Sequence, residues 1–169
     1  MTGAGDPDQD LVRETVDHLA INRLQARYAD TVTRRAWAEL AELFLPEATV
    51  HIDTVSREPF DLTGPDEVGR FIRGAVERFA FFEFVVLNSH VMLDVDGDPD
   101  TASARMFMCE QRLDGATGQW STAYGLYRDR YRRVNGRWWF GDRRYRSLAR
   151  TGPVPEVLGH WTEWGGPST

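Results

Sequence analysis

The sequence predicts an α+β protein in which helices come first and a mostly antiparallel sheet follows, in the order ααββαββββ. Three observations predict this fold class. Apolar residues recur every three or four positions over 10–34, 37–44 and 63–79, the spacing of one helix face. Four runs rich in β-branched and aromatic residues fill 83–148 between turn-forming clusters. Asn135-Gly136 joins the last two runs, and both residues adopt the positive φ of a type I′ hairpin at little cost.

Length and composition indicate a single domain. The chain has 169 residues, of which 41% are hydrophobic and 27% charged, and no apolar run approaches the roughly 18 residues of a membrane helix. The N-terminus is polar and acidic, unlike a secretory signal. We therefore expect a cytoplasmic protein with a flexible N-terminus (1–9), one domain (10–150) and a C-terminal tail (151–169).

The first two predicted helices form a pair. Ile21, Leu24, Tyr28 and Val32 share one helical face, which we expect to be buried. The second helix spans 37–44, and Pro46 is expected to end it, because the residue before a proline is pushed out of the helical region.

Two short strands and a third helix follow. The strands are predicted at 48–54 and 57–62, where Pro59 restricts the second to an edge or irregular position. Thr63-Gly64-Pro65-Asp66 predicts a helix start, with a capping hydroxyl, a proline in the first turn and an acid near the N-terminus.

The remaining strands are predicted at 83–95, 102–113, 120–134 and 137–148. Because residues 83–113 are apolar on both faces, both sides of this part of the sheet should be covered. Helices can cover one side. We expect a second copy to cover the outer face, which gives a homo-oligomer, a dimer or a trimer.

On the strand at 120–134, Tyr127, Asp129 and Tyr131 point to one face, because side chains alternate along a strand. A buried carboxylate needs hydrogen-bond donors, which Tyr28 or Arg143 can supply. Asp129 is either a general acid with a pKa raised by burial or one half of an Asp–Arg or Asp–Tyr pair that braces adjacent strands.

Metal binding and nucleic-acid binding are not expected. The histidines (His18, His51, His90 and His160) lack metal-binding spacing, and Cys109 lies in an apolar run typical of a buried thiol. The net charge is −6, although residues 128–150 hold nine arginines. These arginines either pair with surface acids or meet phosphates; we favour the pairing because no recognition motif accompanies them.

Several motifs together resemble the nuclear-transport-factor-2-like superfamily, and within it the SnoaL-like and scytalone-dehydratase-like branch. The resemblance covers about residues 10–150. It rests on an early Arg-Tyr-Ala with Trp and Phe following, an acid-Ala strand start, a late strand Asn, a Tyr-x-Asp strand and a Gly-x-Trp followed by Arg. The residues are Arg27, Tyr28, Ala29, Trp37, Phe44, Glu47, Ala48, Asn88, Tyr127, Asp129, Gly136, Trp138 and Arg143.

The resemblance implies a cone-shaped α+β barrel in which a strongly curved sheet wraps three helices around a deep, mostly apolar cavity. It also implies an Asp/His acid-base pair in dehydratase-like members. This chain departs from that pattern, with Thr33 where the aspartate is expected and Phe84 and Glu110 where histidines are expected. Glu110 can replace one histidine as a proton carrier.

The candidate catalytic residues are His90, Asp129 and Glu110. If Phe84 points into the cavity, strand alternation brings Asn88 and His90 there too, and His90 can exchange a proton near neutral pH. The alternative for His90 is a histidine bonded within the sheet or exposed at the rim. The candidate substrate-binding residues are Tyr28, Asn88, Arg143, Phe84, Tyr127, Met106 and Met108.

The leading functional hypothesis is a cofactor-free enzyme that cyclises, isomerises or dehydrates a bulky apolar carbonyl compound, polyketide- or steroid-like, by acid/base chemistry. Two alternatives remain: a non-catalytic ligand-binding module, and a structural small subunit of a ring-hydroxylating oxygenase. The tail residues Trp161 and Trp164 either close over the cavity, dock on a neighbouring subunit or fasten the tail to its own domain.

Overall fold

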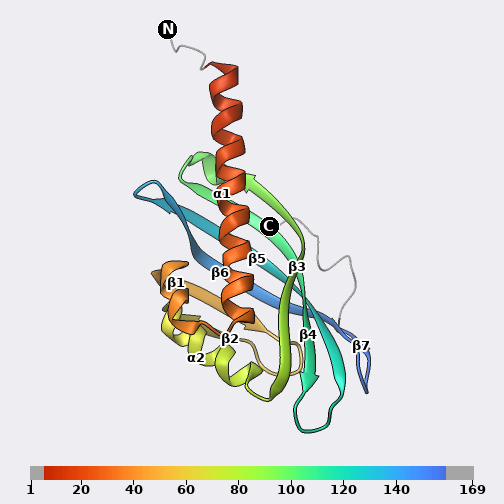
Figure 1. The fold of residues 1–169 in the computed structure, drawn as a ribbon. Helices are drawn as coiled ribbons and strands as arrows, with labels where there is room; N and C mark the ends of the chain where they lie inside the picture. Colours follow the sequence, from red (N-terminus) through yellow and green to blue (C-terminus); the bar gives the residue numbers. More distant parts are fainter. Residues whose placement is uncertain (1–5, 159–169) are drawn as a thin grey trace.

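The computed structural model describes residues 6–158 and shows helices on the concave side of a strongly curved, open sheet (Figure 1). The predicted order ααββαββββ is confirmed, with one short strand added at the end. The helices are α1 (Pro7–Thr33), η1 (Trp37–Glu42, 3₁₀) and α2 (Gly64–Val76), with a 3₁₀ turn η2 (Val95–Gly97). The strands are β1 (Phe44–Asp53), β2 (Phe60–Thr63), β3 (Phe79–Leu93), β4 (Thr101–Asp114), β5 (Trp120–Val134), β6 (Arg137–Arg150) and β7 (Glu156–Val157).

The sheet runs in the order β2-β1-β6-β5-β4-β3, with β7 paired to β6. Only the β1–β6 pair is parallel among the described strands, so the predicted mostly antiparallel sheet is confirmed. Asn135 and Gly136 both have positive φ, 52° and 75°. The hairpin that they form sets β5 and β6 side by side over their full length.

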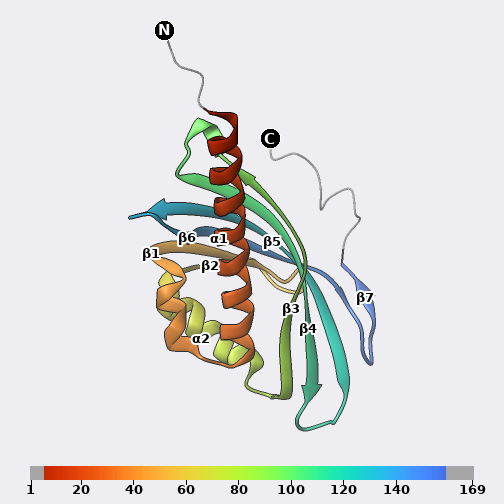
Figure 2. The same cartoon turned by 45° about the horizontal axis from the view of Figure 1, so that its top comes forward.

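Helix α1 spans the concave face, and its N-terminal part projects beyond the sheet (Figures 1 and 2). It begins at Pro7, capped by the Asp6 carboxylate, which accepts a hydrogen bond from the backbone N–H of Asp8. The predicted apolar face is buried: Ile21, Leu24, Tyr28 and Val32. This face anchors the helix on the sheet.

Strand β1 starts at Phe44, four residues before its predicted start. Pro46 therefore lies inside a strand rather than at the end of a helix. The pairing of β1 with β6 is irregular between Phe44 and Thr49. A proline, which lacks a backbone N–H, fits such an irregular segment without breaking a regular ladder.

Helix α2 starts as predicted but is capped differently. The Thr63 hydroxyl forms no capping hydrogen bond, and the backbone N–H of Thr63 donates to the Glu67 carboxylate at 2.7 Å. This bond resembles the reciprocal half of a capping box, but the carboxylate comes from the fourth residue of the helix instead of the third. The helix ends at Val76, so Phe79, expected to close its apolar stripe, instead starts β3.

Strand β3 contains a β-bulge. Val86 pairs with Met108 and Asn88 pairs with Phe107, so Leu87 is one extra residue against β4. Because successive side chains alternate, an extra residue exchanges the faces of every residue that follows it. Leu87 and Met92 are 54% and 45% exposed, so the outer face expected to be covered is open in the single chain.

Within the predicted C-terminal tail, the short strand β7 pairs with Ala149 and Arg150 of β6. Trp161 and Trp164, for which three roles were considered, lie outside the described residues. Within residues 6–158, no helix has the length and hydropathy needed to cross a membrane.

Candidate functional site

A cavity of about 600 Å³ lies between α1, α2 and the concave face of the sheet. Its walls are largely apolar, as expected for a pocket that receives a ring compound. The main apolar lining residues are Val32, Val50, Ile52, Val68, Phe71 and Phe84. They come from the faces that helix and strand periodicity predicts to be buried.

The polar lining of this cavity is dominated by arginine and tyrosine. Glu110 is the one carboxylate among the described residues that line it, and no described histidine does. The lining arginines are Arg57, Arg70, Arg78, Arg112, Arg143 and Arg150, and the lining hydroxyls are those of Tyr28, Tyr127, Tyr145, Ser147 and Thr54.

Arg143 is held in place by Asp129 on the neighbouring strand. Its Nε donates to Asp129 Oδ1 at 2.8 Å and its Nη2 to Oδ2 at 3.1 Å. The Tyr131 hydroxyl also donates to Asp129 Oδ2 and accepts from the Gln25 amide. Asp129 is buried and does not line the cavity. The structure thus contains the bracing Asp–Arg and Asp–Tyr pairs considered as its alternative role.

Aromatic rings enclose the Arg143 guanidinium. Its Cζ atom lies 4.1 Å from the ring centroid of Tyr28, 3.9 Å from that of Tyr127 and 4.4 Å from that of Phe140. Burial lowers the pKa of Arg143, but Asp129 and the two tyrosines more than offset this effect, so the pKa is raised. Arg143 is therefore a permanent cation.

One donor of Arg143 has no partner among the described residues. Its Nη1 atom is buried and has no hydrogen-bond partner among the described residues, while the residue lines the cavity. Buried donors without partners are rare in native proteins because they carry a desolvation cost. Nη1 is therefore a candidate donor to an oxygen of a bound ligand.

The cavity tyrosines are neutral hydrogen-bond donors at neutral pH. Burial raises the pKa of Tyr28, and the nearby charge of Arg143 and a hydrogen bond with Tyr127 oppose this effect. Burial also raises the pKa of Tyr127 and of Tyr145, and the negative charge of Glu110 adds to both shifts. The hydroxyls of Tyr145 and Ser147 are joined by a hydrogen bond at 3.1 Å.

Glu110 lies on β4 opposite Phe84 of β3 and Ala123 of β5. Its carboxylate pairs with Arg112 two residues along the same strand. Its negative charge contributes to the raised pKa of Tyr28, Tyr127 and Tyr145, and all three tyrosines line the same cavity. The structure therefore brings one carboxylate, one buried guanidinium and three phenols into one cavity.

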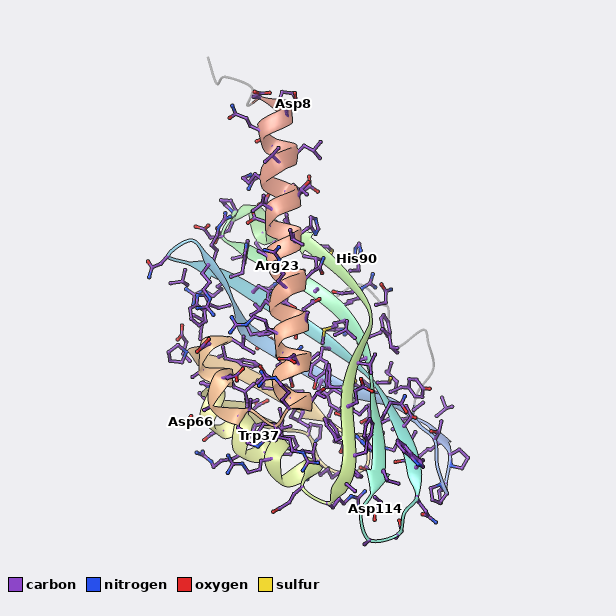
Figure 3. All side chains as sticks on the ribbon, in the orientation of Figure 1. Asp8, Arg23, Trp37, Asp66, His90 and Asp114 are labelled. Atoms are coloured by element: carbon purple, nitrogen blue, oxygen red, sulfur yellow. The ribbon has the colours of Figure 1, made fainter. Side chains whose placement is uncertain are left out.

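The expected inward orientation of Asn88 and His90 is wrong. Both residues are exposed and neither lines the cavity; Figure 3 shows His90 on β3, pointing away from α1. The cause is the bulge at Leu87, which turns Ser89 and Val91 inward and Asn88 and His90 outward. His90 is exposed, as one alternative expected, but it lies on the outer face of the sheet and not at the cavity rim.

Met106 and Met108 face inward but do not line the cavity. Both are fully buried, with 0% and 1% exposure, and they pack into the core instead of leaving space for a ligand. Phe84, Tyr127 and Tyr28 do line the cavity, in edge-to-face or tilted contact with one another.

The two positions where an aspartate and a histidine were expected are joined to each other. The Thr33 hydroxyl accepts a hydrogen bond from the backbone N–H of Phe84 at 3.0 Å. Thr33 therefore fastens the end of α1 to β3. It does not line the cavity, whereas the ring of Phe84 does.

The remaining histidine, cysteine and most of the arginines discussed in the sequence analysis lie outside this cavity. His51 pairs with Asp61 at 2.6 Å near the surface, and Cys109 is buried. At least six of the nine arginines in 128–150 contact carboxylates of the described residues, as the pairing interpretation expects: Arg130, Arg132, Arg133, Arg143, Arg144 and Arg146. No group of three His, Cys, Asp or Glu side chains within 6–158 is placed to hold a metal ion.

Sequence reasoning missed several cavity residues. Tyr145 and Ser147 follow Arg143 at alternate positions on β6, so strand alternation from Arg143 identifies both. Arg57, Arg70 and Arg150 carry no such signal, because they come from a loop, a helix and a strand end that meet only in the folded chain.

Comparisons with known proteins identify a family and similar folds. The family model described as "SnoaL-like domain" matches residues 13–144. A search of the curated proteins found no match. Among solved structures, a putative scytalone dehydratase from Novosphingobium aromaticivorans is similar, with a TM-score of 0.73 and 21% identity over 87% of this chain and 94% of that one.

A second similar structure is hexachlorocyclohexane dehydrochlorinase LinA-type3 from Novosphingobium barchaimii, with a TM-score of 0.70 and 17% identity over 86% of this chain and 97% of that one. At these identities the two structures show the shared fold. The family match spans most of the chain and contains the cavity-lining parts of α1, α2 and β3 to β5. The chain therefore belongs to the SnoaL-like domain family, with the cone-shaped α+β fold of the nuclear-transport-factor-2-like superfamily.

Proposed function

We propose that this protein is a cofactor-free acid/base enzyme that removes a proton beside the carbonyl of a bulky apolar compound. The observation that carries the proposal is the convergence of Glu110, Arg143 and the tyrosines in one cavity. Glu110 takes the role of base that the sequence interpretation gave first to His90. Asp129 becomes a positioning residue that holds Arg143.

The proposed chemistry needs a base and an oxyanion donor. The Glu110 carboxylate removes a proton from the carbon next to the carbonyl, the electron pair of the broken C–H bond forms a C=C bond, and the π pair of the carbonyl moves to its oxygen. Arg143 Nη1 and the hydroxyl of Tyr28 or Tyr127 stabilise that oxygen. In a conjugated enolate, return of the proton from the Glu110 carboxyl to another carbon gives isomerisation; transfer of that proton to a β-hydroxyl, which then leaves as water while the enolate electrons re-form the carbonyl and a C=C bond, gives dehydration.

Arg143 suits the stabilising role because it is preorganised. Its charge is fixed by Asp129 and its plane by three aromatic rings. A donor that does not reorganise during reaction, in a largely water-free site, stabilises developing negative charge more than a solvated one. The neutral tyrosines add hydrogen-bond donors without adding charge.

A non-catalytic ligand-binding module is the second candidate. It is favoured by Thr33 and Phe84, which stand at the expected acid and base positions and bond to each other instead. A purely structural oxygenase subunit needs no ligand cavity and can fill this space with side chains, so the cavity of about 600 Å³ argues against that alternative.

The proposal is tested by hydrogen–deuterium exchange of 2-tetralone in D₂O, followed by NMR. This ketone has two fused rings and an acidic C–H next to the carbonyl. We expect the protein to accelerate the exchange and Glu110→Gln to lose about 100-fold or more of that acceleration, the range for a positioned general base.

Glu83→Gln is the matched control, because Glu83 is an exposed carboxylate on the adjacent strand that does not line the cavity. It should exchange like the unaltered protein. Exchange by Glu110→Gln at the unaltered rate would reject Glu110 as the base. Exchange by the unaltered protein no faster than in buffer would favour the binding module.

A further inference from the structure

The charge of the cavity lining contrasts with the charge of the chain. The whole protein carries a net charge of −6, yet the described cavity lining holds six arginines and one carboxylate. A concave surface lined by one sign of charge concentrates ligands of the opposite sign.

Three of these arginines are already neutralised by carboxylates. Arg112 pairs with Glu110 and Arg143 with Asp129. Arg78 lies 3.8 Å from Asp114. Their charges are compensated within the protein, so they do not by themselves call for an anionic ligand.

The other three lining arginines, Arg57, Arg70 and Arg150, have no carboxylate partner within residues 6–158. Arg150 Nη2 donates to the backbone oxygen of Thr54 at 3.2 Å, which leaves its charge uncompensated. Arg57 stacks on an aromatic ring, Phe60, with its Cζ atom 4.6 Å from the ring centroid. Aromatic and carbonyl contacts position a guanidinium without cancelling its charge.

Their contacts place these three arginines on one rim of the cavity. Arg150 is bonded to Thr54, at the start of the connection between β1 and β2, and Arg57 lies in that same connection. The Arg57 guanidinium also lies 5.6 Å from the ring centroid of Phe71 on α2, and Arg70 directly precedes Phe71. We define this arginine rim as Arg57, Arg70 and Arg150.

We propose that the ligand of this cavity is an amphipathic anion: an apolar ring system that carries a carboxylate, which the arginine rim binds. The rings contact the apolar walls, and the carboxylate accepts hydrogen bonds from planar guanidinium groups, whose fork geometry matches it. The inference rests on the proposed function only in taking this cavity as the ligand site. It names a substrate class, whereas deprotonation by Glu110 is a separate property.

The test compares 2-naphthoate with 2-naphthamide by isothermal titration calorimetry. The two compounds have the same rings and nearly the same shape and differ in charge. We expect the carboxylate to bind about tenfold more tightly, and its affinity to fall as the salt concentration rises from about 50 to about 500 mM, because the rim arginines are solvent-accessible. The affinity of the neutral amide should not change with salt.

The double variant Arg57→Gln/Arg70→Gln should reduce the affinity for 2-naphthoate about tenfold and leave that for 2-naphthamide unchanged. Arg73→Gln is the matched control, because Arg73 is an exposed arginine of α2 outside the cavity lining. Equal affinities of the unaltered protein for the two compounds would overturn the inference, as would equal losses in the double variant and the control.

Glu110→Gln separates this inference from the proposed function. The variant should keep or increase the preference for 2-naphthoate, because the substitution removes negative charge from the lining. If proton exchange depends on Glu110 but the carboxylate preference is absent, the enzyme proposal stands and the substrate class fails. If the preference persists but no exchange occurs, the substrate class stands and the catalytic proposal fails.

Discussion

Asp129 and Arg143 lie directly opposite each other on β5 and β6 and form a two-point ion pair in which both side chains are almost completely inaccessible to solvent. Each charge is tolerated in the core because the other is present. The pair fixes a guanidinium at the wall of the cavity, so it links the stability of the sheet to the geometry of the site.

Removing one charge of this pair should be costly. Asp129→Asn keeps the shape of the side chain but leaves Arg143 buried without a counterion, and we expect the free energy of unfolding to fall by about 3–5 kcal/mol in urea denaturation. The double variant Asp129→Asn/Arg143→Gln should lose less unfolding free energy than the single variant Asp129→Asn. A double variant less stable than Asp129→Asn would show that the charge itself is not the cause.

Gly125 leaves space for two buried side chains, and we expect Gly125→Ala to destabilise the protein. A Cβ atom there would collide with the Tyr145 ring and lie 2.9 Å from Met108 Sδ. Overpacking of this kind costs about 1–3 kcal/mol, measurable by thermal denaturation. In the control Gly74→Ala, the new Cβ has no neighbour within 4 Å, and alanine is the better helix former. Destabilisation by Gly74→Ala equal to that by Gly125→Ala would contradict the steric explanation.

Stability should fall at alkaline pH. Burial raises the pKa of Tyr28, Tyr127, Tyr131 and Tyr145 above the ordinary value of 10.0. The stabilisation is complete below pH 10. Above that pH the unfolded chain releases phenol protons that the folded protein retains, so stability decreases until the folded-state pKa values are passed.

The ionisation of the tyrosines is measured directly by the absorbance of phenolate at about 295 nm. The four buried tyrosines should ionise together with the loss of folded structure seen by circular dichroism, at a higher pH than in denaturant. Ionisation of all five tyrosines of the chain while the fold remains intact would contradict this prediction.

The outer face of the sheet is the expected subunit interface. Leu87 and Met92 are large apolar residues exposed there on the edge strand β3, and we propose that a second copy covers them. Leu87→Glu should shift a dimer or trimer towards the monomer in analytical ultracentrifugation. Arg105→Gln, on the adjacent strand, is the control for a change of charge alone. A monomeric unaltered protein would rule out this interface.

Much of the fold was predictable because its signals are local. The face of α1 that carries Tyr28 and Val32 follows from helical spacing, and the β5–β6 hairpin follows from Asn135-Gly136. Alternation along β5 correctly placed Tyr127 and Asp129 on one buried face. The start of β1 was missed because Pro46 is tolerated at a pairing irregularity that no local signal announces.

The sequence by itself determined the element order, the family resemblance and the Tyr-x-Asp strand that braces Arg143, because these depend on periodicity and on neighbours close in the chain. The tertiary structure alone decided which polar groups meet. One extra residue at Leu87 turns His90 outward, whereas β4 carries Glu110 inward. The arginine rim comes from three distant segments, and such convergence depends on how the sheet curves around the helices, which local patterns do not encode.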